Sequence, residues 1–159
     1  MEGLIPQLYG ADAHEILGAR ALMTSLSSLQ LPWTVVTSGT KPLVTGWFAC
    51  LDLPPVEHLV TAEDVERGKP DPTCYRMGLA QLGLEQRASE VVVIEDSPVG
   101  IRAGRAAGCR VLGLVTSHTL EQVVAAEPDW VVRDLASVRA FKRSDGSVVL
   151  EIRDALVLA

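Results

Sequence analysis

The chain has 159 residues, of which 48% are hydrophobic and 4% aromatic, and its formal net charge is −6. A chain of this length forms one domain that can bury roughly 70% of the surface of its unfolded state, so disorder is excluded. The negative charge argues against nucleic acid or an anionic membrane as a partner, because both select clustered Lys and Arg. A small molecule is therefore the expected partner.

Cysteine usage and the absence of targeting segments indicate the compartment. The three cysteines have no C-x-x-C spacing, which indicates neither a disulfide framework nor a zinc site. No run of about 18 apolar residues is present, and the first residues lack the pattern of a signal peptide. We expect a cytoplasmic protein.

Helices and strands are expected to alternate along the chain. Apolar spacing and capping signals predict helices over residues 14–29, 43–51, 73–82, 98–108 and 119–126. Short β-branched or apolar runs predict strands over residues 33–37, 58–61, 91–94, 110–115 and 130–132. This alternation is typical of a Rossmann-like α/β fold with a doubly wound parallel sheet and right-handed crossovers.

The C-terminal segment has a different pattern. We expect residues 14–140 to form the α/β core and residues 141–159 to form an edge hairpin or tail. The turn signal Asp145-Gly146 precedes an apolar run over residues 147–152, which we expect to pair with residues 155–158.

The most informative segment is the end of the strand over residues 91–94. Two carboxylates, Glu95 and Asp96, follow this apolar run, and ligands of open α/β sheets gather just beyond such strand ends. Ser97 is a good N-cap and Pro98 suits the first position of a helix. The pair is therefore a candidate Mg²⁺ site, with Asp96 as a direct ligand and Glu95 binding directly or through water.

Two further segments supply groups that suit a phosphate. Thr37 ends the first strand, and the amides of Ser38 and Gly39 lie near a helix N-terminus, where orphan N–H groups favour anions. Lys69 lies in a rigid proline-rich loop over residues 68–72 and adds a compact positive charge. Because strand ends converge at one edge of a parallel sheet, these groups and the carboxylate pair are expected to share one site.

Each feature also has a simpler interpretation. Thr37 alone is usually a strand-end residue and Lys69 alone a solvated loop charge, while the acidic pair before Ser97 is a helix cap about as often as a binding site. A dinucleotide-binding domain is disfavoured, because no glycine-rich fingerprint follows a predicted strand. The order and context of the three segments favour the shared phosphate site.

Residues 35–40, 68–72 and 92–100, in this order, resemble the second, third and fourth motifs of the haloacid dehalogenase superfamily of phosphohydrolases. Within it, the opening residues 2–10 and residues 33–40 are similar to fungal glycerol-phosphate and 2-deoxyglucose-6-phosphate phosphatases. The resemblance implies a Mg²⁺-dependent phosphatase of a small sugar or polyol phosphate. It also implies that residues 1–13 are the end of a cap domain or its hinge.

The resemblance further implies roles for individual residues. Thr37 and Lys69 are the expected catalytic residues that hold the phosphate together with Ser38 and Gly39, while Asp96 and Glu95 bind the metal. The family's first motif, D-x-D, supplies the nucleophile and the general acid/base, and this sequence contains no D-x-D. We therefore expect a truncated, catalytically incomplete chain, from a shortened gene model, an alternative start or a decayed copy.

The missing motif has a structural counterpart. In the family's sheet order the strand of the first motif lies between the strand ending at Thr37 and the strand ending at Glu95. Its absence predicts two unpaired edges that pair with each other, recruit a strand from a partner protein, or leave the chain poorly folded. The alternative function is a non-catalytic pseudoenzyme or binding module that retains the phosphate and Mg²⁺ contacts.

Overall fold

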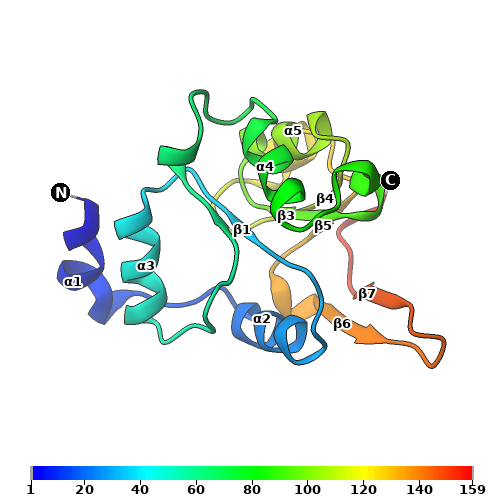
Figure 1. The fold of residues 1–159 in the computed structure, drawn as a ribbon, viewed down its shortest axis with the longest axis horizontal. Coiled ribbons are helices and arrows are strands. Elements are labelled where there is room, and N and C mark those ends of the chain that lie inside the picture. The colour runs from blue at the N-terminus through cyan, green and yellow to red at the C-terminus, as the bar shows by residue number, and fades with distance from the viewer. Residues whose placement is uncertain (1, 159) are drawn as a thin grey trace.

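Three apolar strands form the centre of the fold in the computed structural model, which describes residues 2–158. β3 (Val92–Glu95), β4 (Arg110–Leu114) and β5 (Trp130–Val132) lie side by side and parallel, and β8 (Val157–Leu158) pairs antiparallel with β5. Helices cover the sheet, as expected for continuous apolar strands buried on both faces (Figure 1). The predicted Rossmann-like α/β fold is confirmed.

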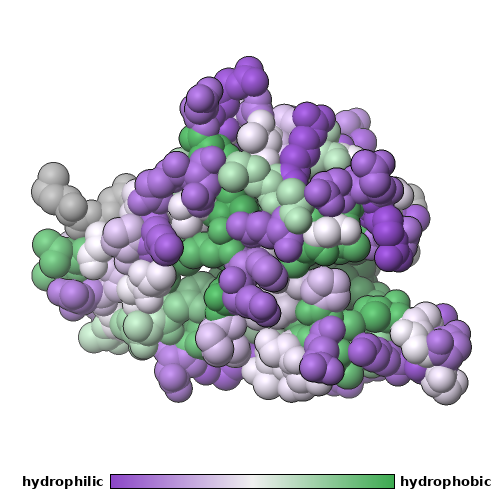
Figure 2. Space-filling model, in the orientation of Figure 1, coloured by the Kyte–Doolittle hydropathy of each residue, from purple (hydrophilic) through white to green (hydrophobic). Residues whose placement is uncertain are grey.

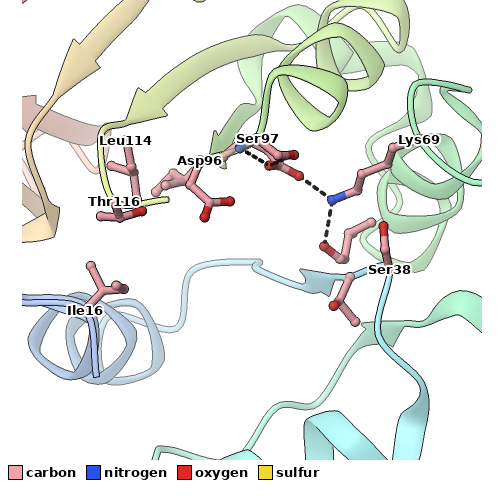
Figure 3. A pocket seen from close by; sticks show the side chains of 11 residues that line it. Ile16, Ser38, Lys69, Asp96, Ser97, Leu114 and Thr116 are labelled. Carbon is pink, nitrogen blue, oxygen red and sulfur yellow. Dashed lines mark hydrogen bonds and ion pairs between the residues drawn. The ribbon is translucent and has the colours of Figure 1, made fainter. Parts of the chain in front are cut away.

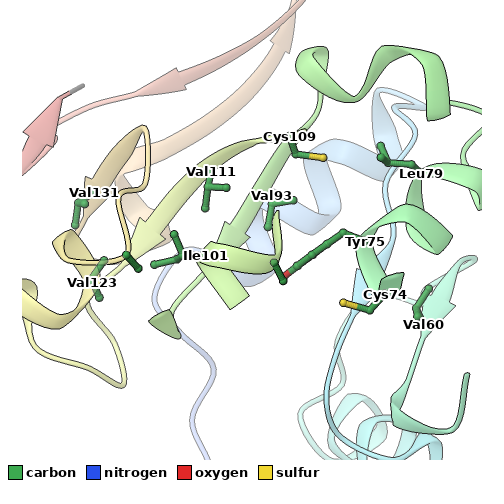
Figure 4. Close-up of a cluster of buried hydrophobic side chains, with 12 residues drawn as sticks. Val60, Cys74, Tyr75, Leu79, Val93, Ile101, Cys109, Val111, Val123 and Val131 are labelled. Carbon is green, nitrogen blue, oxygen red and sulfur yellow. The ribbon is translucent and has the colours of Figure 1, made fainter. Parts of the chain in front are cut away.

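Alternate strand residues build two separate clusters on the two faces of this sheet. Val93, Val111 and Val131 face one side, where α4 (Thr73–Gln81), α5 (Pro98–Ala106) and α6 (Leu120–Val124) supply the opposing side chains (Figure 4). The three valines are at most 7% exposed. This face is the larger core of the domain.

The opposite face is covered by α2 (Ala19–Ser28) and by the C-terminal hairpin. Leu22 of α2 packs with Leu112, Val132 and Val138 in the second cluster. The described part of the chain also contains five 3₁₀ segments: Glu2–Leu4, Gly10–Asp12, Ala62–Asp64, Glu85–Glu90 and Leu135–Ser137. Among the described residues, no helix is long and apolar enough to cross a membrane.

A second, two-stranded parallel sheet stands apart from the first. β1 (Val35–Val36) pairs with β2 (Leu59–Val60), and neither strand pairs with β3. α3 (Lys41–Cys50) follows β1 and packs against α1 (Ile5–Tyr9). Within residues 2–158, no strand lies between the two sheets, so the predicted gap is present and its two edges do not pair with each other.

α4 joins the two sheets. Tyr75 and Leu79 pack in the cluster that contains both Val60 of β2 and Val93 of β3. A methyl group at Gly78 would lie 3.1 Å from a methyl carbon of Val36, so the glycine lets the helix approach β1 closely. Packing on α4 therefore holds β1 beside β3 without a shared ladder of hydrogen bonds.

The C-terminal hairpin pairs other strands than the sequence predicts. Residues 147–152 contain β7 (Val148–Ile152), which pairs antiparallel with β6 (Val138–Lys142), while residues 155–158 contain β8 and join β5. The turn at Asp145-Gly146 fixes this outcome, because Gly146 adopts a φ of 82° and turns the chain back on the strand before it. The hairpin thus begins within the segment predicted as core, and the division at residues 13 and 140 otherwise stays a prediction.

The first predicted helix is shorter than residues 14–29. α2 begins at Ala19, because Gly18 has a left-handed φ of 87° and lies against the backbone of Leu135 and Ala136. The segment before it exposes apolar side chains, including Leu8 at 72% and Leu17 at 67%. Figure 2 shows apolar surface at the end of the molecule that holds α1.

Candidate functional site

A cavity of about 440 Å³ opens between β1 and β3, at the carboxyl ends of both strands. The sequence-predicted residues that line it are Thr37, Ser38, Lys69, Glu95 and Asp96 (Figure 3). Gly39, the sixth predicted residue, is not among the lining residues. Convergence of strand ends, which the sequence predicts, thus brings together a hydroxyl pair, an ammonium group and two carboxylates.

Glu95 ends β3 with its side chain only 7% exposed. Its Oε1 accepts hydrogen bonds from the Lys69 ammonium and, at 2.5 Å, from the Tyr75 hydroxyl. Its Oε2 accepts from the backbone N–H and the hydroxyl of Ser97, at 3.2 and 3.1 Å. A methyl group at Gly100 would lie 2.1 Å from the carboxylate carbon, so the glycine makes room for this buried charge.

Lys69 is as buried as its partner, with 9% of its side chain exposed. Its ammonium donates to Glu95 and, at 3.4 Å, to the carbonyl of Val36, and it lies 4.9 Å from the centre of the Tyr75 ring. An ammonium has three N–H donors, so one remains for a group in the cavity. Lys69, which lines the cavity, is therefore held in place with one N–H still available.

The loop that carries Lys69 is fixed by its own hydrogen bonds. Asp71 accepts from the backbone N–H and the hydroxyl of Thr73, at 2.9 and 2.5 Å, at the start of α4. These hydrogen bonds from Thr73 hold the pKa of Asp71 below its usual value. Because Asp71 stays ionised, the link between the Lys69 loop and α4 persists over the neutral pH range.

The segment after β1 offers fewer free amides than the sequence predicts. The N–H of Gly39 donates to the hydroxyl oxygen of Thr37 at 3.0 Å, so this amide is not free to bind an anion as the sequence predicts. At the start of α3, the N–H of Lys41 donates to the Glu63 carboxylate at 3.0 Å. The hydroxyl protons of Thr37 and Ser38 remain as donors, and Thr37 is oriented by its contact with Gly39.

Asp96 differs from Glu95 in its surroundings. No described group donates a hydrogen bond to its carboxylate, which points into the open space between Thr116 and Ser38 (Figure 3). Mg²⁺ takes only one or two protein carboxylates and completes its shell with water and phosphate oxygens. The described residues contain no cluster of three acidic, His or Cys side chains, so a cation here would depend on Asp96 and on a bound anion.

Several residues of the site have no place in the sequence prediction, among them Thr116, Ile16 and Tyr75. Thr116 follows β4 and Ile16 precedes α2, and both line the cavity. Tyr75 lies behind it, in contact with Lys69 and Glu95. The strand-end rule could have found Thr116, but no sequence signal distinguishes Tyr75 from an ordinary core aromatic residue.

Comparison with known proteins gives the same assignment of fold and class. The sequence profile of the family described as "Haloacid dehalogenase-like hydrolase" matches residues 8–114. Glycerol-1-phosphate phosphohydrolase 1 of Saccharomyces cerevisiae is 39% identical over 145 residues, which cover 87% of this chain and 58% of that protein. 2-Deoxyglucose-6-phosphate phosphatase 1 of the same yeast is 33% identical, with coverages of 91% and 65%.

A solved structure supports the match. The crystal structure of a HAD family hydrolase from Deinococcus radiodurans, with bound phosphate and sodium, has a TM-score of 0.73 at 25% identity and covers 82% of this chain and 59% of that one. The fold and these relatives define a Rossmann-type α/β domain of the hydrolase class. More particularly, the chain belongs to the haloacid dehalogenase-like hydrolases. It spans less than two thirds of the length of each of these three relatives.

Proposed function

We propose that this chain binds the phosphate group of a small sugar or polyol phosphate together with Mg²⁺, as one half of a phosphomonoester hydrolase site. The observation that carries the proposal is the cavity in which the Lys69 ammonium and the Thr37 and Ser38 hydroxyls face the free carboxylate of Asp96. The names of the yeast relatives, which act on glycerol-1-phosphate and 2-deoxyglucose-6-phosphate, support this substrate class.

Each residue has a defined task in this proposal. Lys69 gives its remaining N–H to a phosphate oxygen, and Thr37 and Ser38 donate from their hydroxyl groups. Asp96 holds the Mg²⁺ ion, which when bound neutralises negative charge on the phosphate. The neighbouring Glu95 holds Lys69.

We propose that the chain alone does not turn over a substrate. Hydrolysis through a phosphoenzyme needs a nucleophile in line with the phosphorus atom. The carboxylates that line the cavity are Glu95, whose oxygens accept from Lys69, Tyr75 and Ser97, and Asp96, which is assigned to the metal. Phosphate binding without turnover is the expected behaviour.

The test uses the purified chain, inorganic phosphate and Mg²⁺, with binding followed by ³¹P NMR and turnover measured on p-nitrophenyl phosphate. We expect phosphate binding that weakens at least about tenfold in Lys69→Met, since a charge-assisted hydrogen bond contributes about 1.5–3 kcal/mol. The exposed Lys142→Met is the matched control and should bind like the wild type. No binding by the wild type refutes the proposal, and Mg²⁺-dependent turnover that Asp96→Asn abolishes refutes the claim of incompleteness.

We further propose that a partner protein donates a strand to the gap between β1 and β3. Val35 and Thr37 donate their N–H groups to the carbonyls of His58 and Val60, so the N–H of Val36 points away from β2. Val91 accepts from Arg110, and by the same alternation the polar groups of Val92 and Ile94 point away from β4. Two parallel edges with unpaired backbone groups thus face one gap.

The gap defines the chemistry of its occupant. Val36 and Ile94 line it with apolar side chains, while Lys69 lies at its carboxyl end. An extended apolar strand, parallel to both edges and ending in an aspartate, complements these groups. An aspartate at that end would also bring the carboxylate that the site lacks.

Hydrogen exchange tests the strand partner. We expect the amides of Val36, Val92 and Ile94 to exchange rapidly in the free chain and to gain protection with a synthetic peptide of alternating Val and Thr that ends in Asp. The same peptide with a central proline is the control, because proline cannot donate to the ladder. Equal protection by both peptides, or by neither, contradicts strand donation.

A non-catalytic binding module is the second candidate, and the Lys69–Glu95 pair favours it because the anion site is ordered without any nucleophile. Phosphate binding that persists when a strand peptide is bound, still without turnover, would select this function.

We also propose a cytoplasmic location, supported by the three free thiols Cys50, Cys74 and Cys109. Cell fractionation with a tagged chain tests the location.

A further inference from the structure

Tyr75 contacts both members of the buried ion pair. Its hydroxyl donates to Oε1 of Glu95 at 2.5 Å, and the face of its ring lies 4.9 Å from the Lys69 ammonium. The side chain is 7% exposed and comes from α4, the helix that joins the two sheets. Tyr75 therefore contacts both the Glu95 carboxylate and the Lys69 ammonium.

The hydrogen bonds of Glu95 leave it no free acceptor site. A carboxylate has about four lone-pair sites. Lys69 and Tyr75 occupy two on Oε1, and the N–H and hydroxyl of Ser97 occupy two on Oε2. Glu95 could bind a metal ion only by releasing one of these donors, whereas no described group donates to the Asp96 carboxylate.

The hydrogen bond that Tyr75 donates fixes Oε1 of Glu95 at the position from which it accepts from the Lys69 ammonium.

We infer that Tyr75 is a positioning residue of the anion site. It holds Glu95 and Lys69 as one unit, so that Lys69 presents its remaining N–H to the cavity and Asp96 is the only carboxylate of the adjacent pair that binds a metal ion. The inference rests on the proposed function, but it concerns a residue outside the cavity lining and assigns Glu95 to the lysine instead of the metal.

A purely structural role for Tyr75 is the competing interpretation, since its ring also packs in the larger core. The variant Tyr75→Phe keeps the ring and removes only the hydroxyl. Leu79→Ala is the matched control, because Leu79 lies one turn further along the same helix, is 5% exposed and belongs to the same cluster. It weakens packing without touching the ion pair.

The first measurement is the acylation rate of Lys69 by an N-hydroxysuccinimide ester, followed by mass spectrometry. Lys41 and Lys142, the other two lysines of the chain, are internal references. We expect Tyr75→Phe to raise the rate of Lys69 at least about threefold relative to both references, while Leu79→Ala leaves that ratio unchanged. An unchanged ratio in Tyr75→Phe overturns the inference.

The second measurement is the affinity for inorganic phosphate. Removal of a residue that orients a ligand group typically costs about tenfold or more, and we expect that loss in Tyr75→Phe but not in Leu79→Ala. Wild-type affinity in Tyr75→Phe contradicts the positioning role. If the wild-type chain binds no phosphate, the proposed function fails, and the acylation ratio still decides the role of Tyr75.

The third measurement separates the two carboxylates, with Mn²⁺ as the probe and its EPR signal as the readout. We expect Asp96→Asn to weaken Mn²⁺ binding at least about tenfold and Glu95→Gln to change it less than twofold. Equal losses in the two variants would make Glu95 a metal ligand and overturn this part of the inference.

Discussion

Replacing Gly100 by alanine tests whether the buried Glu95 carboxylate is held in one place. The new methyl group would lie 2.1 Å from the carboxylate carbon and from Oε1, and 2.3 Å from Oε2. Real side chains do not approach this closely, so either Glu95 or α5 has to move. Glu95 cannot swing away freely, because four hydrogen bonds from Lys69, Tyr75 and Ser97 hold it.

Two opposing effects set the magnitude of the change. Alanine is favoured over glycine within a helix by about 1 kcal/mol. Breaking a buried ion pair costs roughly 3–5 kcal/mol, because the remaining charge is left without a partner. We therefore expect Gly100→Ala to lower the free energy of unfolding by roughly 2–4 kcal/mol, which corresponds to a fall in melting temperature of roughly 5–15 °C for a chain of this size.

Urea denaturation followed by circular dichroism measures this change. Gly104→Ala is the control in the same helix, where the new methyl group would lie 3.1 Å from side-chain carbons of Val93 and Val111. It gains the same helix propensity and meets only valine side chains, so we expect a change within about 1 kcal/mol. If Gly100→Ala is as stable as Gly104→Ala, Glu95 is not held as described.

Three further predictions concern Tyr75, Cys74 and Asp129. Burial and the neighbouring carboxylate raise the pKa of Tyr75, so the folded chain keeps a proton that the unfolded chain releases above about pH 10. The free energy of unfolding therefore falls above this pH by up to about 1.4 kcal/mol per pH unit. Urea titrations of the wild type and Tyr75→Phe should show a steeper fall for the wild type, and equal slopes contradict the prediction. Burial raises the pKa of the Cys74 thiol, so iodoacetamide should alkylate this thiol at least about tenfold more slowly than the exposed Cys50. Mass spectrometry measures both alkylation rates, and comparable rates would show that Cys74 is accessible. The Asp129 carboxylate accepts a hydrogen bond from the backbone N–H of Val111 at 2.7 Å. Asp129→Ala should therefore lower the free energy of unfolding by roughly 1–3 kcal/mol, and Asp129→Asn, which keeps an acceptor, should lower it less. Equal losses in thermal unfolding experiments would show that this hydrogen bond is not the cause.

The amino-acid sequence by itself determined the elements and most of the site. Apolar β-branched runs and capping residues predicted β3, β4 and β5, and Ser97 caps α5 as predicted by accepting the N–H of Gly100 at 3.1 Å. Parallel strands place their carboxyl ends at one edge, which is why Thr37, Lys69 and Asp96 could be assigned to one cavity from their order in the chain.

Only the tertiary structure decided which groups are already paired. The contacts of Lys69 and Tyr75 with Glu95 join residues of different segments whose approach depends on packing between elements, and no local pattern records them. The sequence presents Glu95 and Asp96 as equivalent neighbours. The fold separates them: the Glu95 carboxylate ends β3 and accepts hydrogen bonds from Lys69, Tyr75 and Ser97, whereas no described group donates to the Asp96 carboxylate, although both residues line the cavity.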